Sequence, residues 1–334
     1  MISKAALAAV LLASSPAAGT TALPQNPAAS AAVSGAAPGD PGGMTWAVRP
    51  AGPKGPSGRD YFVYSLSPGQ TIRDKVAITN LSDRTQTFRV YATDAFNTAD
   101  GSFTLLTADR TASGVGTWVT FQRGAYTVKA GKAVEVPFTL TVPSNATPGD
   151  HGGGIVASLT QQQTTARGQR LNVDRRVAAR VYLRAAGPLT PALQVSALRT
   201  GYDAAPAGTG DLSVTFTIRN TGNLRMTALA RIRAVGPFGL PLGERISRRV
   251  PELLPGNSYT FTERIGGVVP AGRLTASVRL SPTDPQSGRP VAARPVSRSE
   301  SLWHVPWLIT GVLVLLVAVG VLYVRRRRPG RAGA

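Results

Sequence analysis

The sequence predicts an all-β protein with two tandem immunoglobulin-like β-sandwiches followed by one C-terminal transmembrane α-helix. Three observations predict this fold. Strand-sized runs rich in Val, Ile, Thr, Phe and Tyr recur from Met44 to Leu280, and Gly, Pro, Asn and Asp bound them. Part of this pattern occurs twice, which indicates two similar domains. An uncharged apolar run, Trp307–Val324, stands near the end of the chain.

Residues 1–43 are predicted to be a signal peptide and a disordered leader. Lys4 precedes the apolar stretch Ala5–Ala13, and small residues follow, as in secretory signal peptides. The stretch Pro24–Gly43 is rich in Ala, Pro, Gly and Ser and has no periodicity. Such a composition is typical of a disordered segment.

The first predicted sandwich spans residues 44–187. Turn dipeptides such as Pro68-Gly69 and Asp100-Gly101 separate its strand-sized runs. Short strands at this spacing are typical of antiparallel sandwiches. The predicted strands are Met44–Arg49, Tyr61–Leu66, Ile72–Thr79, Thr87–Thr93, Thr117–Phe121, Val134–Val142, Gly154–Thr160 and Arg176–Ala185.

The second predicted sandwich spans residues 188–280, and a weak internal repeat supports it. Lys75–Ala92 resembles Ser213–Ile232, since each is a strand, a polar turn and another strand. Asn80 and Asn220 mark the two turns. Residues 281–304 are rich in Pro, Arg and Ser and are predicted to be a linker to the membrane.

Residues 305–324 are predicted to form the transmembrane helix, with a length of about 30 Å at 1.5 Å per residue. Aromatic rings mark both ends, and arginines begin the basic cytoplasmic tail of residues 325–334. This order predicts a single-pass type I protein of the cell membrane with an extracellular ectodomain. The predicted membrane-anchoring residues are Trp307, Tyr323, Arg325, Arg326, Arg327 and Arg328.

The composition limits the chemistry of the ectodomain. There is no cysteine, which excludes disulfides and thiolate metal sites, and only His151 and His304 offer imidazole. The formal net charge is +20. Residues 161–300 hold 20 basic and 8 acidic residues, so most of the external positive charge lies there. Such a domain attracts anionic wall polymers or lipid headgroups, although arginine-rich codon usage also explains part of the charge.

One predicted strand carries the candidate binding residues. Along Arg176–Ala185, Val, Ala and Leu alternate with arginines and a tyrosine, so one face is apolar and the other is basic. Arginine forks bind carboxylate or phosphate groups bidentately. The alternative is a solvated strand face. The candidate residues for binding an anionic polymer are Arg176, Arg180, Tyr182 and Arg184.

No catalytic, cofactor-binding or metal-binding residue is predicted. The run from His151 to Gly154 resembles the oxyanion loop of lipases, but the G-x-S-x-G motif is absent. The run is therefore interpreted as a tight corner in which glycine supplies a positive φ. Asp94, Asp100 and Asp109 only partly match a calcium loop, and Asx turns explain them more simply.

Several runs in the first half of the chain resemble one known family. They are MTWAVRPAG, SPGQTIRDKVAITNLSDRTQTFRVYATDAFNTADGSF, WVTF, VEVPFTLTVPSNATPGDHGGGIVASL and RRVAARVYLRAAG. In this order they resemble the DUF916 family, the peptidoglycan-binding domain of WxL-interacting proteins, in its high-GC Gram-positive branch. The resemblance covers roughly Trp46 to Gly187. It implies a signal peptide, two immunoglobulin-like domains, a C-terminal transmembrane helix and binding to peptidoglycan.

The sequence therefore predicts a membrane-anchored cell-surface binding or adhesion protein and not an enzyme. Its expected partner is peptidoglycan or another wall component, and no nucleic acid. The alternative is an accessory or chaperone-like scaffold subunit that binds a surface protein by docking a strand on an exposed sheet edge. Neither function requires a cofactor.

Overall fold

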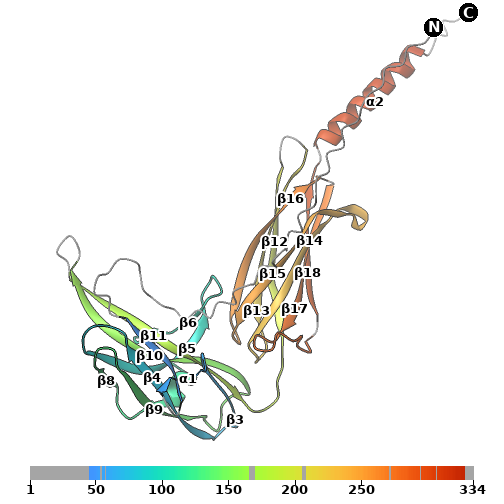
Figure 1. The fold of residues 1–334 in the computed structure, drawn as a ribbon. Coiled ribbons are helices and arrows are strands. Elements are labelled where there is room, and N and C mark those ends of the chain that lie inside the picture. Colours follow the sequence, from blue (N-terminus) through green and yellow to red (C-terminus); the bar gives the residue numbers. More distant parts are fainter. Residues whose placement is uncertain are drawn as a thin grey trace, which may run out of the picture. The chain divides into compact units, whose positions relative to one another are not determined.

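The protein contains two β-sandwiches and a C-terminal helix (Figure 1). The computed structural model describes residues 45–52, 55–56, 58–164, 170–204, 208–270, 272–293, 295–305 and 307–327. The predicted signal peptide and leader, residues 1–43, lie outside the described residues. The fold class predicted from the sequence, mostly β with two sandwich domains, is confirmed.

Two sheets build the first sandwich. One has the order β2-β1-β4-β9-β7, and the other has the order β3-β11-β10-β5-β6, with β8 pairing to β5. All pairs are antiparallel except β3 with β11. The elements are β1 (Trp46–Gly52), β2 (Gly55–Pro56), β3 (Phe62–Leu66), β4 (Thr71–Asn80), β5 (Gln86–Asn97), β6 (Phe103–Leu105), α1 (Val115–Trp118), β7 (Val119–Phe121), β8 (Ala125–Val128), β9 (Ala133–Thr141), β10 (Gly149–Thr164) and β11 (Arg170–Ala185).

The alternating sequence pattern explains the first core. Along β11, Val181 and Leu183 point inward and are at most 1% exposed, as period-two alternation requires. They join a core that includes Phe62, Ile78 and Phe88, all fully buried. This core forms without disulfides, since the chain has no cysteine.

The second sandwich has its own core and two sheets, β12-β13-β16 and β15-β14-β17-β18. Its inward residues are mainly Val, Leu, Ile and Ala, with Phe216 fully buried among them. The elements are β12 (Leu193–Ala204), β13 (Gly210–Asn220), β14 (Met226–Val235), η1 (Pro237–Gly239), β15 (Pro241–Leu253), β16 (Ser258–Val268), β17 (Gly272–Thr283) and β18 (Val296–His304).

The linker predicted for residues 281–304 is wrong. Strand β17 continues to Thr283, and β18 pairs with β17 over nine residues from Val296 to His304. Val296 and Leu302 of β18 pack against the second core. Serines occupy many of the remaining positions of β18, so its hydrophobic alternation is weak, and this is why the sequence pattern suggested a linker.

The two asparagines of the internal repeat have the same role in both sandwiches. Asn80 and Asn220 are fully buried. Each side-chain Nδ2 donates to the carbonyl four residues ahead, at 2.8 and 2.7 Å, and to a carbonyl of a distant segment, that of Val128 or Leu253, at 2.9 Å. Each asparagine thus joins its own turn to a distant strand end of the same sandwich.

The helix predicted at the C-terminus is present as α2 (Trp307–Arg327). Its large described apolar side chains are exposed, from 49% at Val321 to 73% at Trp307. Within the described part of the chain, no helix meets the length and hydropathy expected of a membrane span. Membrane crossing and the anchoring roles of Trp307, Tyr323 and Arg325 therefore stay predictions, and Arg328 lies outside the described residues.

Candidate functional site

The predicted binding residues share one face of β11. Val181 and Leu183 enter the core, so Arg176, Arg180 and Arg184 point to the opposite face. Arg176 is exposed, whereas Arg180 and Arg184 are half-buried. The fourth predicted residue, Tyr182, also alternates to this face, but it is only 4% exposed.

The two arginines nearer the hairpin tip contact the segment around β6. Arg176 Nη1 donates to the carbonyl of Leu106 at 3.1 Å. The guanidinium carbon of Arg180 lies 4.6 Å from the ring centroid of Phe103, which is cation–π geometry. Both guanidiniums keep further N–H groups, because each has five.

Tyr182 is buried by residues of both sandwiches. Its ring meets Tyr61 and Phe103 edge-on, and the guanidinium of Arg225 from the second sandwich lies 4.0 Å from its centroid. Its hydroxyl donates to Glu252 Oε2 at 3.2 Å. Burial, together with the negative charge of Glu252, raises the pKa of Tyr182 to about 12.

Arg184 is held by an acidic partner. Its Nε and Nη2 donate to Asp150 Oδ1 and Oδ2 at 2.6 and 2.9 Å, a bidentate pair. This hydrogen bonding raises the pKa of Arg184. Asp150, 8% exposed, also accepts the backbone N–H of Arg225 at 2.9 Å. Tyr182 and Arg184 therefore belong to the junction of the two sandwiches, and only the Arg176 and Arg180 part of the predicted stripe faces outward.

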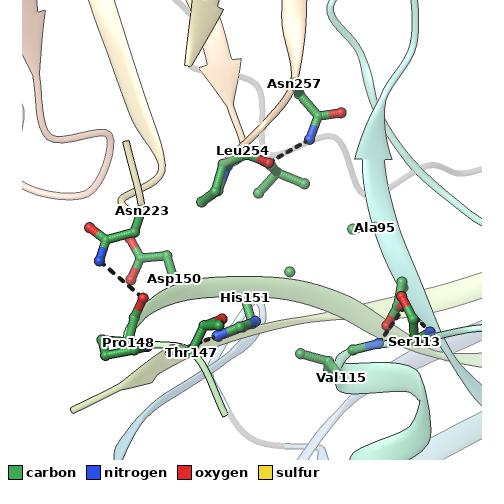
Figure 2. Close-up of a pocket in the computed structure, with 14 residues that line it drawn as sticks. Ala95, Ser113, Val115, Thr147, Pro148, Asp150, His151, Asn223, Leu254 and Asn257 are labelled. Carbon is green, nitrogen blue, oxygen red and sulfur yellow. Dashed lines mark hydrogen bonds between the residues drawn. The ribbon is translucent and has the colours of Figure 1, made fainter. Parts of the chain in front are cut away.

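Two asparagines complete this junction. Asn97, at the end of β5, donates from Nδ2 to the Glu252 carbonyl at 2.7 Å and accepts the Leu254 N–H at 2.9 Å. Asn223 donates from Nδ2 to the Pro148 carbonyl at 3.0 Å, as Figure 2 shows. Both side chains thus serve as donors to backbone carbonyls across the junction.

A polar pocket of about 300 Å³ lies beside these contacts (Figure 2). Its carboxylates already have structural partners: Asp94 accepts the N–H groups of Ser113, Gly114 and Gly116 at 2.6 to 2.7 Å. The pocket is lined by Asp94, Ala95, Ser113, Gly114, Val115, Thr147, Pro148, Asp150, His151, Gly152, Asn223, Leu254, Pro255 and Asn257.

The sequence suggested a tight corner from His151 to Gly154, and this prediction is wrong. It lies inside β10, and none of its three glycines has a positive φ. The glycines are needed for space: a Cβ on Gly153 would lie 2.8 Å from the Thr93 carbonyl oxygen and 2.8 Å from Val115. His151 itself bonds the Thr147 carbonyl through Nε2 at 2.8 Å and packs against Trp118.

The aspartates weighed as calcium ligands do not gather at one place. Asp94 binds the start of α1, and Asp100 accepts hydrogen bonds from Thr98 and Ser102 within its own turn. Those hydrogen bonds lower the pKa of Asp100. Among the described residues there is no group of three or more His, Cys, Asp or Glu side chains placed to hold a metal ion.

The sequence reasoning missed Asn97, Asn223 and Arg225 as junction residues. Each stands in a polar turn or directly beside one, where such residues are common, so composition gave no signal.

Comparisons with known proteins give a fold likeness only. No family model matches the chain, and no curated protein matches it, so the resemblance to the DUF916 family stays a prediction. Solved structures with a similar fold include the class 5 fimbriae chaperone CfaA, with 10% identity, a TM-score of 0.37, and coverage of 78% of this chain and 100% of that one. The Pseudomonas aeruginosa CupB2 chaperone has 10% identity and a TM-score of 0.31, with coverage of 73% and 99%. The E. coli chaperone DraB has 9% identity and a TM-score of 0.30, with coverage of 76% and 98%. At these scores no residue role is transferred.

Proposed function

We propose that this protein is a surface binding protein that docks an extended segment of a partner protein along the outer edge of β11. The observation that supports this function is the length of that edge. Strand β11 has 16 residues, and β3 pairs with its outer edge only from Val181 to Ala185. From Arg176 to Arg180 no described strand pairs with this edge. An exposed sheet edge is the usual template for adding a strand from another chain.

The backbone groups of this edge have the orientation that docking requires. The N–H of Ala186 donates to the Leu66 carbonyl across the β3 edge at 2.9 Å. Because N–H and C=O groups alternate in direction along a strand, those of Ala178 and Arg180 point to the same side. A docked strand would continue the line of β3 and add ladder hydrogen bonds.

The junction gives this edge a firm support. Tyr182 and Arg184, the next even-numbered residues of β11, bond Glu252 and Asp150. Asp150 in turn accepts the Arg225 N–H of the second sandwich. The edge therefore continues directly into the part of β11 that both sandwiches hold, which lowers the entropy lost when a partner binds.

We include attachment to the cell membrane through α2 in this proposal. The apolar side chains of α2 from Val312 to Val324 are about half exposed or more, on every side of the helix. An apolar helix of this kind is stable in a lipid environment, with Arg325 and Arg326 at its cytoplasmic end. The ectodomain would then lie outside the cell.

Binding to a wall component through Arg176, Arg180, Tyr182 and Arg184 is a weaker candidate. Arg184 is paired with Asp150 and Tyr182 is buried, so two of the four residues are committed to the fold. This leaves Arg176, which is exposed, and Arg180, which is half-buried. An ion pair made by either one would contribute only about 0.2–1 kcal/mol to binding.

A pair of substitutions at Ala178 tests strand docking. Ala178→Pro removes the outward N–H, whereas Ala178→Val keeps it on the same edge. With tagged full chain recovered from its own cells, we expect a stoichiometric protein partner with the wild type and Ala178→Val, and none with Ala178→Pro. Fluorescence of the buried Trp46 and Trp118 checks that each variant is folded.

The same preparations separate the two functions. If Ala178→Pro keeps its stoichiometric partner, the β11 edge is not the docking site. The wall-binding function replaces the proposal under two conditions. The wild type must recover no partner protein but sediment with isolated peptidoglycan sacculi, and the double variant Arg176→Gln, Arg180→Gln must no longer sediment with them.

A further inference from the structure

The outer face of the four-stranded sheet in the second sandwich is a basic surface that the sequence pattern does not single out. In β14, Ala230, Ile232 and Ala234 are at most 2% exposed, so Arg231 and Arg233 between them face outward. The strand register places three more exposed arginines on the same side. The arginines of this face are Arg231, Arg233, Arg249, Arg273 and Arg279.

Three of these arginines donate to neutral hydroxyl groups. Arg231 Nη1 donates to Ser281 at 3.1 Å, Arg233 Nε donates to Ser277 at 3.0 Å, and Arg273 Nη2 donates to Ser301 at 3.3 Å. In the described part of the chain, none of the five arginines forms an ion pair. Strands β14 and β17 contain no carboxylate at all. The face therefore keeps its charge and its remaining N–H donors.

The opposite sheet of the same sandwich shows that arginine-rich codon usage does not explain this face. Its outer side carries threonine pairs, Thr215 with Thr262 and Thr217 with Thr260, joined through their hydroxyls. Its charged residues nearly cancel, because three arginines stand beside two aspartates. These residues are Arg199, Arg219, Arg264, Asp203 and Asp211.

We propose that the outer face of β14 and β17, with Arg249 of β15, binds an extended polyanion that carries a phosphate group in each repeat. Arg231 and Arg279 are direct cross-strand neighbours, and Arg233 lies two residues from Arg231, about 6.6 Å away. Arg273 and Arg279 are about 20 Å apart along β17. One small anion reaches only part of this set, whereas a chain with repeated charges meets several arginines in turn.

Phosphate chemistry fits the donors on this face. An arginine fork binds two phosphate oxygens, and the oxygens that remain can accept from neighbouring serine hydroxyls such as those of Ser277 and Ser281. Each exposed contact is weak, so affinity comes from several acting together and falls as salt rises. This inference does not rest on strand docking at β11, which lies in the other sandwich.

The test measures binding of labelled long-chain polyphosphate to the full chain by fluorescence anisotropy over a range of salt concentrations. The test variant carries Arg231→Gln, Arg233→Gln and Arg279→Gln. The control variant loses the same charge from the opposite sheet through Arg199→Gln, Arg219→Gln and Arg264→Gln. We expect roughly tenfold weaker binding and a shallower salt dependence in the test variant, and a change of less than about twofold in the control.

Several outcomes overturn the proposal. Equal losses in the two variants would mean that only net charge matters, and a wild type that does not bind polyphosphate would also reject it. If polyglutamate binds as tightly as polyphosphate, the face does not select phosphate. If soluble dioctanoyl phosphatidylglycerol competes equally well per phosphate, the face takes single lipid headgroups and not a polymer. The Ala178→Pro variant is a further control. If it binds polyphosphate as tightly as the wild type does, this binding is separate from strand docking.

Discussion

Tyr182 illustrates how a side chain predicted to be exposed becomes part of the interior. The alternation along β11 places it beside Arg180 and Arg184, which the sequence shows. The structure adds two residues of the second sandwich: Arg225, whose guanidinium lies over the ring, and Glu252, which accepts a hydrogen bond from the hydroxyl. The phenol is therefore desolvated and close to a carboxylate, and both effects disfavour the phenolate.

The raised pKa of Tyr182 predicts a loss of stability in alkaline solution. The folded pKa, about 12, lies above the ordinary value of 10, so the contribution is fully present below pH 10 and is lost as pH rises toward 12. Two pKa units correspond to about 2–3 kcal/mol at most. We expect the unfolding free energy of the wild type to fall more steeply across this window than that of Tyr182→Phe. Parallel curves for the two proteins would contradict the assignment.

At the scale of single elements, β10 shows why glycine is repeated in a strand. Gly152 and Gly154 face the outer side, where added Cβ atoms would meet Leu254 and Leu105 at 3.1 and 2.5 Å. Gly153 faces α1 and the first core. Neighbouring atoms thus lie close to the strand on both faces, and a residue larger than glycine does not fit at these three positions.

Gly153→Ala is accordingly expected to destabilise the first sandwich by about 1–3 kcal/mol, since the new methyl group overpacks Val115 and the rigid Thr93 backbone. Gly124→Ala is the matched control, because nothing lies within 4 Å of the added atom there. Urea unfolding followed by the fluorescence of Trp46 and Trp118 measures both variants. Equal midpoints for the two substitutions would show that the strand can shift to make room.

At the scale of the whole molecule, the junction links the two sandwiches by specific hydrogen bonds. Asp150 receives N–H donors from both sandwiches, from Arg184 in one and Arg225 in the other. Asn97 and Asn223 reach across in opposite directions. Because these groups are mostly buried or half-buried, losing one partner leaves the other without a hydrogen bond.

We expect Asn97→Ala to weaken the junction without unfolding either core. It leaves the Leu254 N–H and the Glu252 carbonyl without their side-chain partner, a cost of about 1–3 kcal/mol. Hydrogen exchange of the Leu254 amide should accelerate by roughly tenfold to a hundredfold. Asn172→Ala, at an exposed position of β11, is the control and should leave that rate unchanged. Protection of Leu254 that survives Asn97→Ala would place the coupling elsewhere.

Local sequence patterns were enough to predict most of the strands, the two sandwiches and the C-terminal helix. Alternation of apolar and polar residues depends only on near neighbours in the chain, and it correctly assigns Val181 and Leu183 to the inward face of their strand. The repeated Asn80 and Asn220 turns were recognisable for the same reason. Where serines dilute the alternation, as in β18, the local signal failed and a strand was predicted to be a linker.

The availability of polar residues to a partner, in contrast, depends on the tertiary structure. Arg184, Arg231 and Arg176 look alike in the sequence, but Arg184 meets Asp150 of the neighbouring strand β10, Arg231 meets only a serine, and Arg176 meets a carbonyl. These partners are 34, 50 and 70 residues away along the chain. Such pairings depend on which strands become neighbours, and strand order is set by the packing of the whole sandwich and not by the residues beside each arginine.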